Sequence, residues 1–244
     1  MSEENTKKPL TPFRAFLDKV VFAFYVVALV LAVCFSTFIW FQKTYFSTYW
    51  VNGQSMWPTL NADAIDANGV PFNEEKRALD GATGVDFVIG DAHQNAIDHI
   101  KRFDIVVCKY SDSDYSDKIK RVIVMPGETF YIDSTGAGNE GNGVLHILNT
   151  TTNDYEIIPQ EFTKIEVGAY PAVYAKPTTL KENEYFVMGD NRANSSDSRQ
   201  HGPITKSNIE AKTIALVAKC KIVYNVSAGK YEPTNVNYSW PRFF

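Results

Sequence analysis

The chain is poor in cysteine and histidine and has no excess of positive charge, and these shortages exclude several classes of function. Its 244 residues contain three cysteines and four histidines, and no Cys/His spacing resembles a zinc site. The formal net charge is −4 at pH 7, which argues against a nucleic-acid partner. The sequence also contains no internal repeat. We therefore expect no metal, no cofactor and no nucleic acid.

All three cysteines lie in apolar stretches. Cys34 belongs to a long apolar run, and Cys108 and Cys220 belong to runs that are typical of strands. A disulfide bond between Cys108 and Cys220 and a pair of buried, unpaired thiols are both compatible with the sequence.

Charged residues are absent from residues 20–41, which form a long apolar run. As a helix rising 1.5 Å per residue, this run spans roughly 30 Å, the thickness of a bilayer core. A buried core helix is one alternative, but the run is apolar on every face. A cleaved signal peptide is another, but it would be shorter and end in a small-x-small site, and the run exits through Trp40-Phe41-Gln42-Lys43-Thr44-Tyr45. We predict an uncleaved membrane anchor and no second span.

Basic residues are concentrated on one side of this anchor. Lys43 follows it closely, whereas the residues that precede it are Lys7, Lys8, Arg14 and Lys19. This bias places the N-terminus in the cytoplasm. Pro9 and Pro12 argue against a long helix ahead of the anchor. The predicted divisions are a cytoplasmic tail, a transmembrane anchor and an extracytoplasmic domain, at residues 1–19, 20–41 and 42–244.

Short apolar stretches separated by turn residues predict a mainly β domain after the anchor. The predicted core covers residues 42–60, 102–130 and 181–225. Its strands are expected at 45–51, 105–110, 118–125, 184–188 and 215–224, and residues 209–215 are ambiguous.

Two insertions separate the parts of this core. Residues 61–101 are polar and rich in Gly, Asn and Asp, which predicts a surface insertion with a short strand at 87–89 and about one helical turn at 74–79. Residues 131–180 predict a β-rich insertion, with strands at 131–133, 143–148 and 155–158.

Ser55 follows the anchor closely, within the stretch Asn52-Gly53-Gln54-Ser55-Met56-Trp57-Pro58-Thr59-Leu60. Such residue types mark turns in many proteins, so the stretch alone fits a surface turn. It also fits a nucleophile, but a serine hydroxyl needs a base to remove its proton. The Gly-x-Ser-x-Gly elbow of many serine hydrolases is absent.

Lys120 is one candidate base. It lies in the apolar strand predicted at 118–125, where alternation places it on one face with Val122 and Val124. Apolar burial lowers the pKa of a lysine from about 10.4, so that a neutral amine becomes available near pH 7. The alternative is a lysine that extends to solvent from a strand edge.

His201 is the other candidate base. The remaining histidines are expected at the surface or packed in a strand, and they are His93, His99 and His146. In a triad, Asp190 or Asp197 would orient His201. These residues belong to the loop 189–202, which is dense in Asp, Asn, Arg and Ser and fits either a solvated turn or a loop locked beside a site by paired charges.

Taken together, four stretches resemble the successive sequence boxes of type I signal peptidases, in the single-anchor form of Gram-positive bacteria. They are Ser55-Met56-Trp57-Pro58-Thr59-Leu60, Arg102-Phe103-Asp104-Ile105-Val106-Val107, Lys120-Arg121-Val122-Ile123-Val124-Met125-Pro126-Gly127-Glu128 and Gly189-Asp190-Asn191-Arg192-Ala193-Asn194-Ser195-Ser196-Asp197-Ser198-Arg199. The order of the boxes and the position of the anchor also match.

The resemblance implies a largely β signal-peptidase-like fold and a Ser–Lys dyad. Ser55 would be the nucleophile and Lys120 the general base, with the Ser55 backbone N–H in the oxyanion hole. Some members carry a serine two residues before the nucleophile, and Gly53 takes that place here, which leaves the second oxyanion donor open. Ser195 would orient Lys120. The supporting charges of the loop would be Asp190, Arg192, Asp197 and Arg199.

The chain departs from the boxes at positions outside this dyad. Phe103 and Val124 replace glycines, Met125 takes the place of leucine, and Glu128 replaces aspartate. The 61–101 segment is also longer than the resemblance leads us to expect. These departures bear on the shape of the substrate groove.

The expected function is a membrane-anchored serine endopeptidase that removes signal peptides from secretory preproteins at the outer face of the cell membrane. The bilayer is the second expected partner, with Trp57 or the aromatic C-terminus in contact with lipid. The alternative is an anchored, non-catalytic β module that binds exported proteins or cell-wall components.

Overall fold

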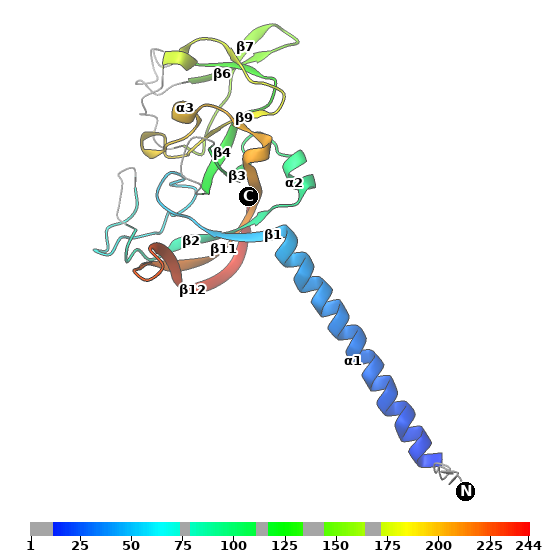
Figure 1. The fold of residues 1–244 in the computed structure, drawn as a ribbon. Helices are drawn as coiled ribbons and strands as arrows, with labels where there is room; N and C mark the ends of the chain where they lie inside the picture. The colour runs from blue at the N-terminus through cyan, green and yellow to red at the C-terminus, as the bar shows by residue number, and fades with distance from the viewer. Residues whose placement is uncertain (1–11, 74–78, 111–116, 134–143, 164–171) are drawn as a thin grey trace. The chain divides into compact units, whose positions relative to one another are not determined.

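The computed structural model describes residues 12–73, 79–110, 117–133, 144–163 and 172–244 (Figure 1). The chain divides into two compact units, Met1–Tyr45 and Phe46–Phe244. The first contains one long helix, and the second is mainly β, as the sequence predicts.

Helix α1 covers Pro12–Tyr45 and contains the whole predicted anchor. Its segment Pro12–Phe41 is long and apolar enough to cross a membrane. The expectation that Pro12 argues against a helix was wrong. Proline suits the first turn of a helix, because the backbone N–H that it lacks has no partner there. Pro9 lies outside the described residues.

The larger sheet of the second unit has the strand order β1-β2-β11-β3-β4-β9-β10, and β12 pairs with β11 (Figure 1). All of its pairs are antiparallel. The strands are β1 (Phe46–Trp50), β2 (Val85–Asp91), β3 (Ile105–Cys108), β4 (Lys118–Val124), β9 (Glu184–Met188), β10 (Ile204–Thr205), β11 (Ile209–Asn225) and β12 (Lys230–Phe243).

A second sheet has the order β7-β6-β5-β8 and confirms the predicted β-rich group between 131 and 180. Its strands are β5 (Thr129–Asp133), β6 (Val144–Asn149), β7 (Asp154–Ile157) and β8 (Thr178–Thr179). The short helices are α2 (Gln94–Asp98), α3 (Ser198–His201) and the 3₁₀ turns η1 (Ala172–Ala175), η2 (Arg192–Asn194) and η3 (Lys206–Asn208).

Strand β2 corrects the prediction for residues 61–101. It lies between β1 and β11 in the larger sheet, so this part of the segment belongs to the core and not to a surface insertion. Asp86 and Gly90 interrupt its apolar pattern, and only 87–89 were predicted as strand. Asp86 is buried because it binds Asn61, a pairing that local sequence does not reveal. The helical turn predicted at 74–79 falls largely outside the described residues.

Strand β12 was not predicted at all. It forms a hairpin with β11, which itself runs through the ambiguous 209–215 segment. Pro233 and Pro241 make the stretch a poor strand candidate by sequence, but proline is tolerated at a sheet edge, where its missing N–H costs no ladder bond. The domain core therefore extends beyond residue 225.

Cys108 and Cys220 are both buried free thiols, which decides the open question against a disulfide bond. Burial raises the pKa of Cys108 to about 12 and that of Cys220 to about 11. Both thiols therefore stay protonated and act as small core residues.

Candidate active site

Ser55 lies at the exposed side of a turn whose other residues anchor it in the core. Met56 and Leu60 are buried in a cluster with Val88 and Ile105, although Ser55 itself is partly exposed. The backbone N–H of Asn191 donates to the Ser55 carbonyl at 3.0 Å. The turn is therefore held both by apolar packing below it and by the loop after β9.

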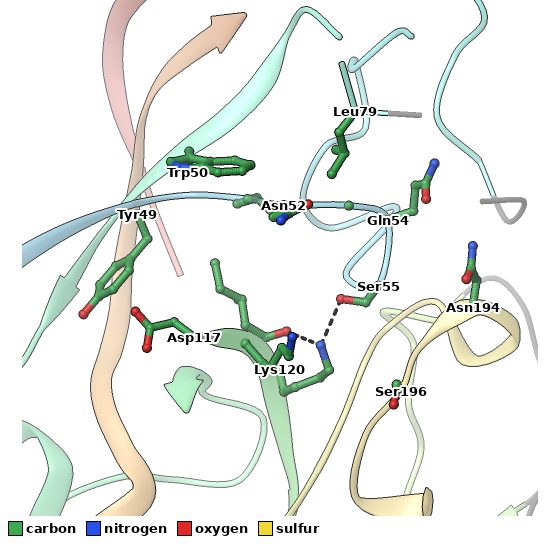
Figure 2. Close-up of a pocket in the computed structure, with 14 residues that line it drawn as sticks. Tyr49, Trp50, Asn52, Gln54, Ser55, Leu79, Asp117, Lys120, Asn194 and Ser196 are labelled. Carbon is green, nitrogen blue, oxygen red and sulfur yellow. Dashed lines mark hydrogen bonds between the residues drawn. The ribbon is translucent and has the colours of Figure 1, made fainter. Parts of the chain in front are cut away.

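Lys120 lies on β4, opposite Val106 of β3, and only 3% of its surface is exposed. Its Nζ is 3.0 Å from Ser55 Oγ and donates to the Ile119 carbonyl at 2.9 Å (Figure 2). Since β4 lies between β3 and β9 and the side chain is buried, the lysine does not extend to solvent from a strand edge, and burial lowers its pKa. A neutral amine at this distance can accept the proton of the serine hydroxyl.

The predicted common face of Lys120, Val122 and Val124 holds only as far as Val122. The register between β4 and β9 shifts between Val122 and Val124, which is the mark of a bulge. As a result Val124 packs in the same core cluster as Ile123, apart from the cluster that contains Val122.

A cavity of about 400 Å³ opens beside the Ser55–Lys120 pair (Figure 2). Residues 49–55 line one side of it and residues 117–120 another, and Leu79, Asn194 and Ser196 complete the lining. Within the described ranges, no group of three or more His, Cys, Asp or Glu side chains is placed to hold a metal ion.

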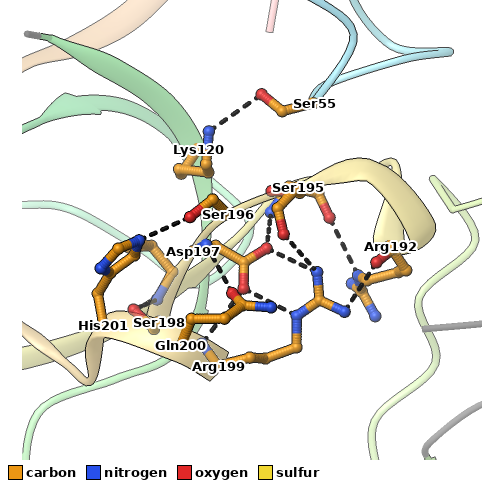
Figure 3. A network of polar contacts seen from close by, with 12 residues as sticks. Ser55, Lys120, Arg192, Ser195, Ser196, Asp197, Ser198, Arg199, Gln200 and His201 are labelled. Atoms are coloured by element: carbon orange, nitrogen blue, oxygen red, sulfur yellow. Dashed lines mark hydrogen bonds and ion pairs between the residues drawn. The ribbon is translucent and has the colours of Figure 1, made fainter. Parts of the chain in front are cut away.

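The loop after β9 is held together by buried ionic contacts (Figure 3). Arg199 Nε and Asp197 Oδ1 are 2.8 Å apart, and both side chains are almost completely buried. Arg199 also donates to the carbonyls of Arg192 and Ser195. Burial opposes ionisation of Asp197, but the hydrogen bond and charge of Arg199 outweigh it and lower the pKa of the carboxyl.

Asp190 binds a residue that the sequence reasoning did not assign, Arg121. The two side chains form a bidentate pair, with Nε–Oδ1 at 2.8 Å and Nη2–Oδ2 at 2.6 Å. Arg121 follows Lys120 on β4, so the same strand supplies the candidate base on one face and an anchor for the loop on the other. Arg192 donates instead to the Gly189 carbonyl and to Gln160.

Phe103 takes the place of a glycine in the family boxes, and its backbone shows why glycine suits this position. Its φ is 73°, in the left-handed region where glycine has no steric cost. Two contacts stabilise phenylalanine in this conformation. The Phe103 ring packs against Phe162 with centroids 5.1 Å apart, and the Phe103 carbonyl accepts a hydrogen bond from Arg121 at 2.8 Å.

Ser195 was expected to orient Lys120, and that role stays a prediction. Among the described residues, the hydrogen bonds of Lys120 Nζ go to Ser55 and Ile119, and the buried Ser195 hydroxyl has no partner that meets full hydrogen-bond geometry. Gly189 lies tightly between Ser195 and the turn that carries Ser55. A Cβ added to Gly189 would lie 2.2 Å from Ser195 Oγ and 2.3 Å from the Ser55 carbonyl oxygen.

This close approach yields a prediction for Gly189→Ala. The added methyl must push apart the Ser55 turn and the loop after β9, so we expect peptidase activity to fall by about 10²-fold, the loss typical of a misplacement of about 1 Å. Activity assays at matched folded concentration measure the effect. Gly229→Ala is the control, because nothing lies within 4 Å of its added methyl and its φ of 64° imposes backbone strain far from the loop. Equal activities would contradict the prediction.

The His201 triad does not assemble around Ser55. His201 Nε2 lies 2.6 Å from Ser196 Oγ (Figure 3). The His201 ring packs on Tyr110. Asp190 and Asp197 each bind an arginine. His146, expected to be packed in a strand, is half-buried and stacks on Tyr131.

Comparisons with known proteins show which family the chain resembles. A family model described as signal peptidase, peptidase S26, matches residues 21–218. Signal peptidase I S of Bacillus subtilis (strain 168) is 31% identical over 186 residues, which cover 75% of this chain and 80% of that protein. A signal peptidase I of Bacillus amyloliquefaciens is 28% identical over 185 residues, covering 75% and 79%.

A solved signal peptidase I from Enterococcus faecalis V583 is also similar, with a TM-score of 0.30 and 23% identity over 46% of this chain and 95% of that chain. The family model covers most of the sequence and includes both Ser55 and Lys120. The resemblance drawn from the sequence boxes is thereby confirmed, and the chain belongs to the signal peptidase S26 family.

Proposed function

We propose that this chain is a membrane-anchored serine endopeptidase that removes N-terminal signal peptides from exported preproteins. The observation that carries the proposal is the 3.0 Å approach of Lys120 Nζ to Ser55 Oγ beside an open cavity. Membership of the signal peptidase S26 family supports the same substrate class.

In the proposed reaction, neutral Lys120 takes the hydroxyl proton as Ser55 Oγ bonds to the scissile carbonyl carbon. The carbonyl oxygen becomes an oxyanion, which the Ser55 backbone N–H stabilises. The Lys120 ammonium then gives its proton to the leaving amine as the C–N bond breaks. Water hydrolyses the resulting ester, and Lys120 acts again as base. Burial lowers the pKa of Lys120, which favours the neutral amine that the first step needs.

The substrate would bind as an extended strand between the two backbone segments that line the cavity, 49–55 and 117–120. Main-chain hydrogen bonds would supply affinity, and pockets for alternate side chains would select small residues, typically alanine, at the −3 and −1 positions. Asp190, Arg192, Asp197 and Arg199 would act as supports that hold the loop against the dyad.

A preprotein cleavage assay tests the function. Purified full-length chain is expected to release a mature protein whose new N-terminus lies after the −1 alanine, and replacing that alanine with phenylalanine should stop cleavage. Ser55→Ala is the matched inactive control. Binding of the preprotein without any cleavage by the wild type would support the alternative, a non-catalytic β module.

The chain associates with a membrane through the apolar helix α1. We place its N-terminus in the cytoplasm and the second unit outside, on the basis of the Lys/Arg bias around the anchor. Accessibility of the second unit to protease added outside intact cells measures the orientation. Protection of the unit would contradict it.

We propose that the second unit contacts lipid through β12 and not through Trp57. Trp57 packs against a core cluster, whereas Trp240 is 95% exposed and shares β12 with exposed Tyr238 and Phe243. We expect Trp240→Ala to weaken liposome binding by residues 46–244 about tenfold, because transfer of one aromatic side chain is worth on the order of 1.5–3 kcal/mol. Trp57→Ala is the matched control, expected to bind like wild type. Equal binding by both variants and wild type would exclude this role for Trp240.

A further inference from the structure

The hydrogen-bond ladder between β1 and β2 ends just before the nucleophile turn, and Asn61 takes over from it. The last ladder contact is the Val51 N–H donating to the Asp86 carbonyl at 2.9 Å. Beyond that point, Asn61 Nδ2 donates to the carbonyls of Val51 at 2.9 Å and Gly53 at 2.7 Å. One side-chain amide therefore binds the carbonyls of two alternate residues in the segment that leads to Ser55.

The position of this amide is itself fixed. Asn61 is completely buried, its N–H donates to Asp86 Oδ2 at 2.7 Å, and its Oδ1 accepts from the Asp86 N–H at 2.8 Å. Since Oδ1 is defined by a backbone donor, Nδ2 must face the two carbonyls. The backbone of Asn61 has φ 62°, a conformation that asparagine tolerates better than most residues.

The contact at Gly53 sets the direction of the next peptide group. In a planar trans peptide the C=O and the following N–H point in opposite directions. With the Gly53 carbonyl held on Asn61, the Gln54 N–H points away from Asn61, and both Gly53 and Gln54 line the cavity. Among the described residues, no acceptor is found for the backbone N–H of Gln54 or of Ser55.

We infer that Asn61 is a positioning residue for the reaction: it fixes the Gly53–Gln54 peptide so that the backbone N–H groups of Gln54 and Ser55 together receive the oxyanion. This arrangement would need no side-chain hydroxyl at residue 53, where the chain has glycine. The inference rests on the proposed function, in which Ser55 is the nucleophile.

The test compares two ligands that differ only at the reacting carbon, a peptide ending in the aldehyde of alanine and the same peptide ending in the primary alcohol. Ser55 Oγ adds to the aldehyde carbon, the carbonyl π bond breaks, and the new oxygen takes the oxyanion position as the hydroxyl proton passes to Lys120. The alcohol has no carbonyl and reports ground-state binding alone. The ratio of the two dissociation constants therefore measures the oxyanion site.

For Asn61→Gly, which keeps the backbone conformation and removes the amide, we expect kcat on a preprotein to fall by about 10²-fold with KM nearly unchanged. The aldehyde should lose affinity by a similar factor, and the alcohol should not. Asn153→Gly is the matched control, because Asn153 has φ 59° in an exposed turn. Asn61→Ser, which can hold one of the two carbonyls, should be intermediate.

Each outcome decides a different point. If wild type binds the aldehyde no better than the alcohol, the proposed Ser55 chemistry fails. A second outcome is that wild type binds the aldehyde more tightly than the alcohol, with the same ratio of dissociation constants in Asn61→Gly and Asn61→Ser. That result overturns the role of Asn61 and leaves the proposed function standing. Measurements are made at a temperature where circular dichroism shows each variant folded. If Asn61→Gly does not fold, Asn61→Ser carries the test alone, and an unchanged ratio in it overturns the role.

Discussion

Lys120→Met is expected to lower peptidase activity by about 10²–10⁴-fold, the usual contribution of a positioned general base. Methionine fills a similar volume but cannot accept the Ser55 proton, which Lys120 Nζ is placed to take at 3.0 Å. The activity of the two proteins on a preprotein, at equal concentration of folded protein, measures the loss. Cleavage within threefold of wild type would exclude Lys120 as the base.

The same substitution is expected to change the pH dependence of stability. Burial lowers the pKa of Lys120 in the folded protein, and the unfolded chain keeps the ordinary value of about 10.4. Between the two pKa values the unfolded state binds more protons, so the stability of wild type rises with pH through this window. Lys120→Met has no such group. The free energy of unfolding of Lys120→Met minus that of wild type should therefore be largest at low pH. This difference should fall as the pH approaches about 10.4.

Urea titrations of both proteins at several pH values check this result. Lys118→Met is the matched control, because Lys118 lies on the same strand and is less buried than Lys120. If the difference in free energy of unfolding between Lys120→Met and wild type stayed constant up to pH 10, Lys120 would not be desolvated in the folded protein.

Arg121→Ala is expected to destabilise the domain by about 3–5 kcal/mol. The substitution leaves the Asp190 carboxylate, which has no exposed surface, without the cation that binds it in two places. It also removes the stacking of the guanidinium on Phe162 at 4.2 Å. Because Asp190 precedes Asn191, whose N–H binds the Ser55 carbonyl, activity should fall together with stability.

Two further variants separate charge from geometry at this pair. Arg121→Lys keeps the charge but cannot form the bidentate contact, so it should recover only part of the stability. Lys181→Ala removes an exposed ion pair with Glu184, in which the lysine side chain is 79% exposed, and should change stability little. Urea unfolding of the three variants measures the differences. If Arg121→Ala were as stable as Lys181→Ala, the buried Arg121–Asp190 pair would make no net contribution to the free energy of unfolding.

Local patterns were sufficient for much of the fold. An uncharged apolar run predicts α1, and short runs of β-branched and aromatic residues predict β3, β4 and β9 closely. The failures share one physical cause, which is that tertiary contacts override the local signal. Asp86 sits in an inner strand, where Asn61 donates to one oxygen of its carboxylate and Lys219 lies 3.5 Å from the other, and the prolines of β12 are tolerated because β12 is an edge.

The candidate site was predicted unevenly for the same reason. Ser55, Lys120 and the loop 189–202 stand out because residue types match family boxes. Arg121 and Asn61, which hold them, do not stand out, because Arg121 binds Asp190 and Asn61 is fixed by Asp86, both distant in the sequence. Alternation along β4 could have singled out Arg121, which must point away from Lys120. No local signal identifies Asn61.

The central claim, that Lys120 and not His201 activates Ser55, is tested most directly by one side-by-side measurement. Preprotein cleavage is followed for wild type and for Ser55→Ala, Lys120→Ala and His201→Ala at equal folded concentration. The structure predicts that the first two variants are inactive and that His201→Ala cleaves like wild type, since His201 contacts Ser196 and Tyr110. An inactive His201→Ala beside an active Lys120→Ala would contradict the dyad and establish the triad.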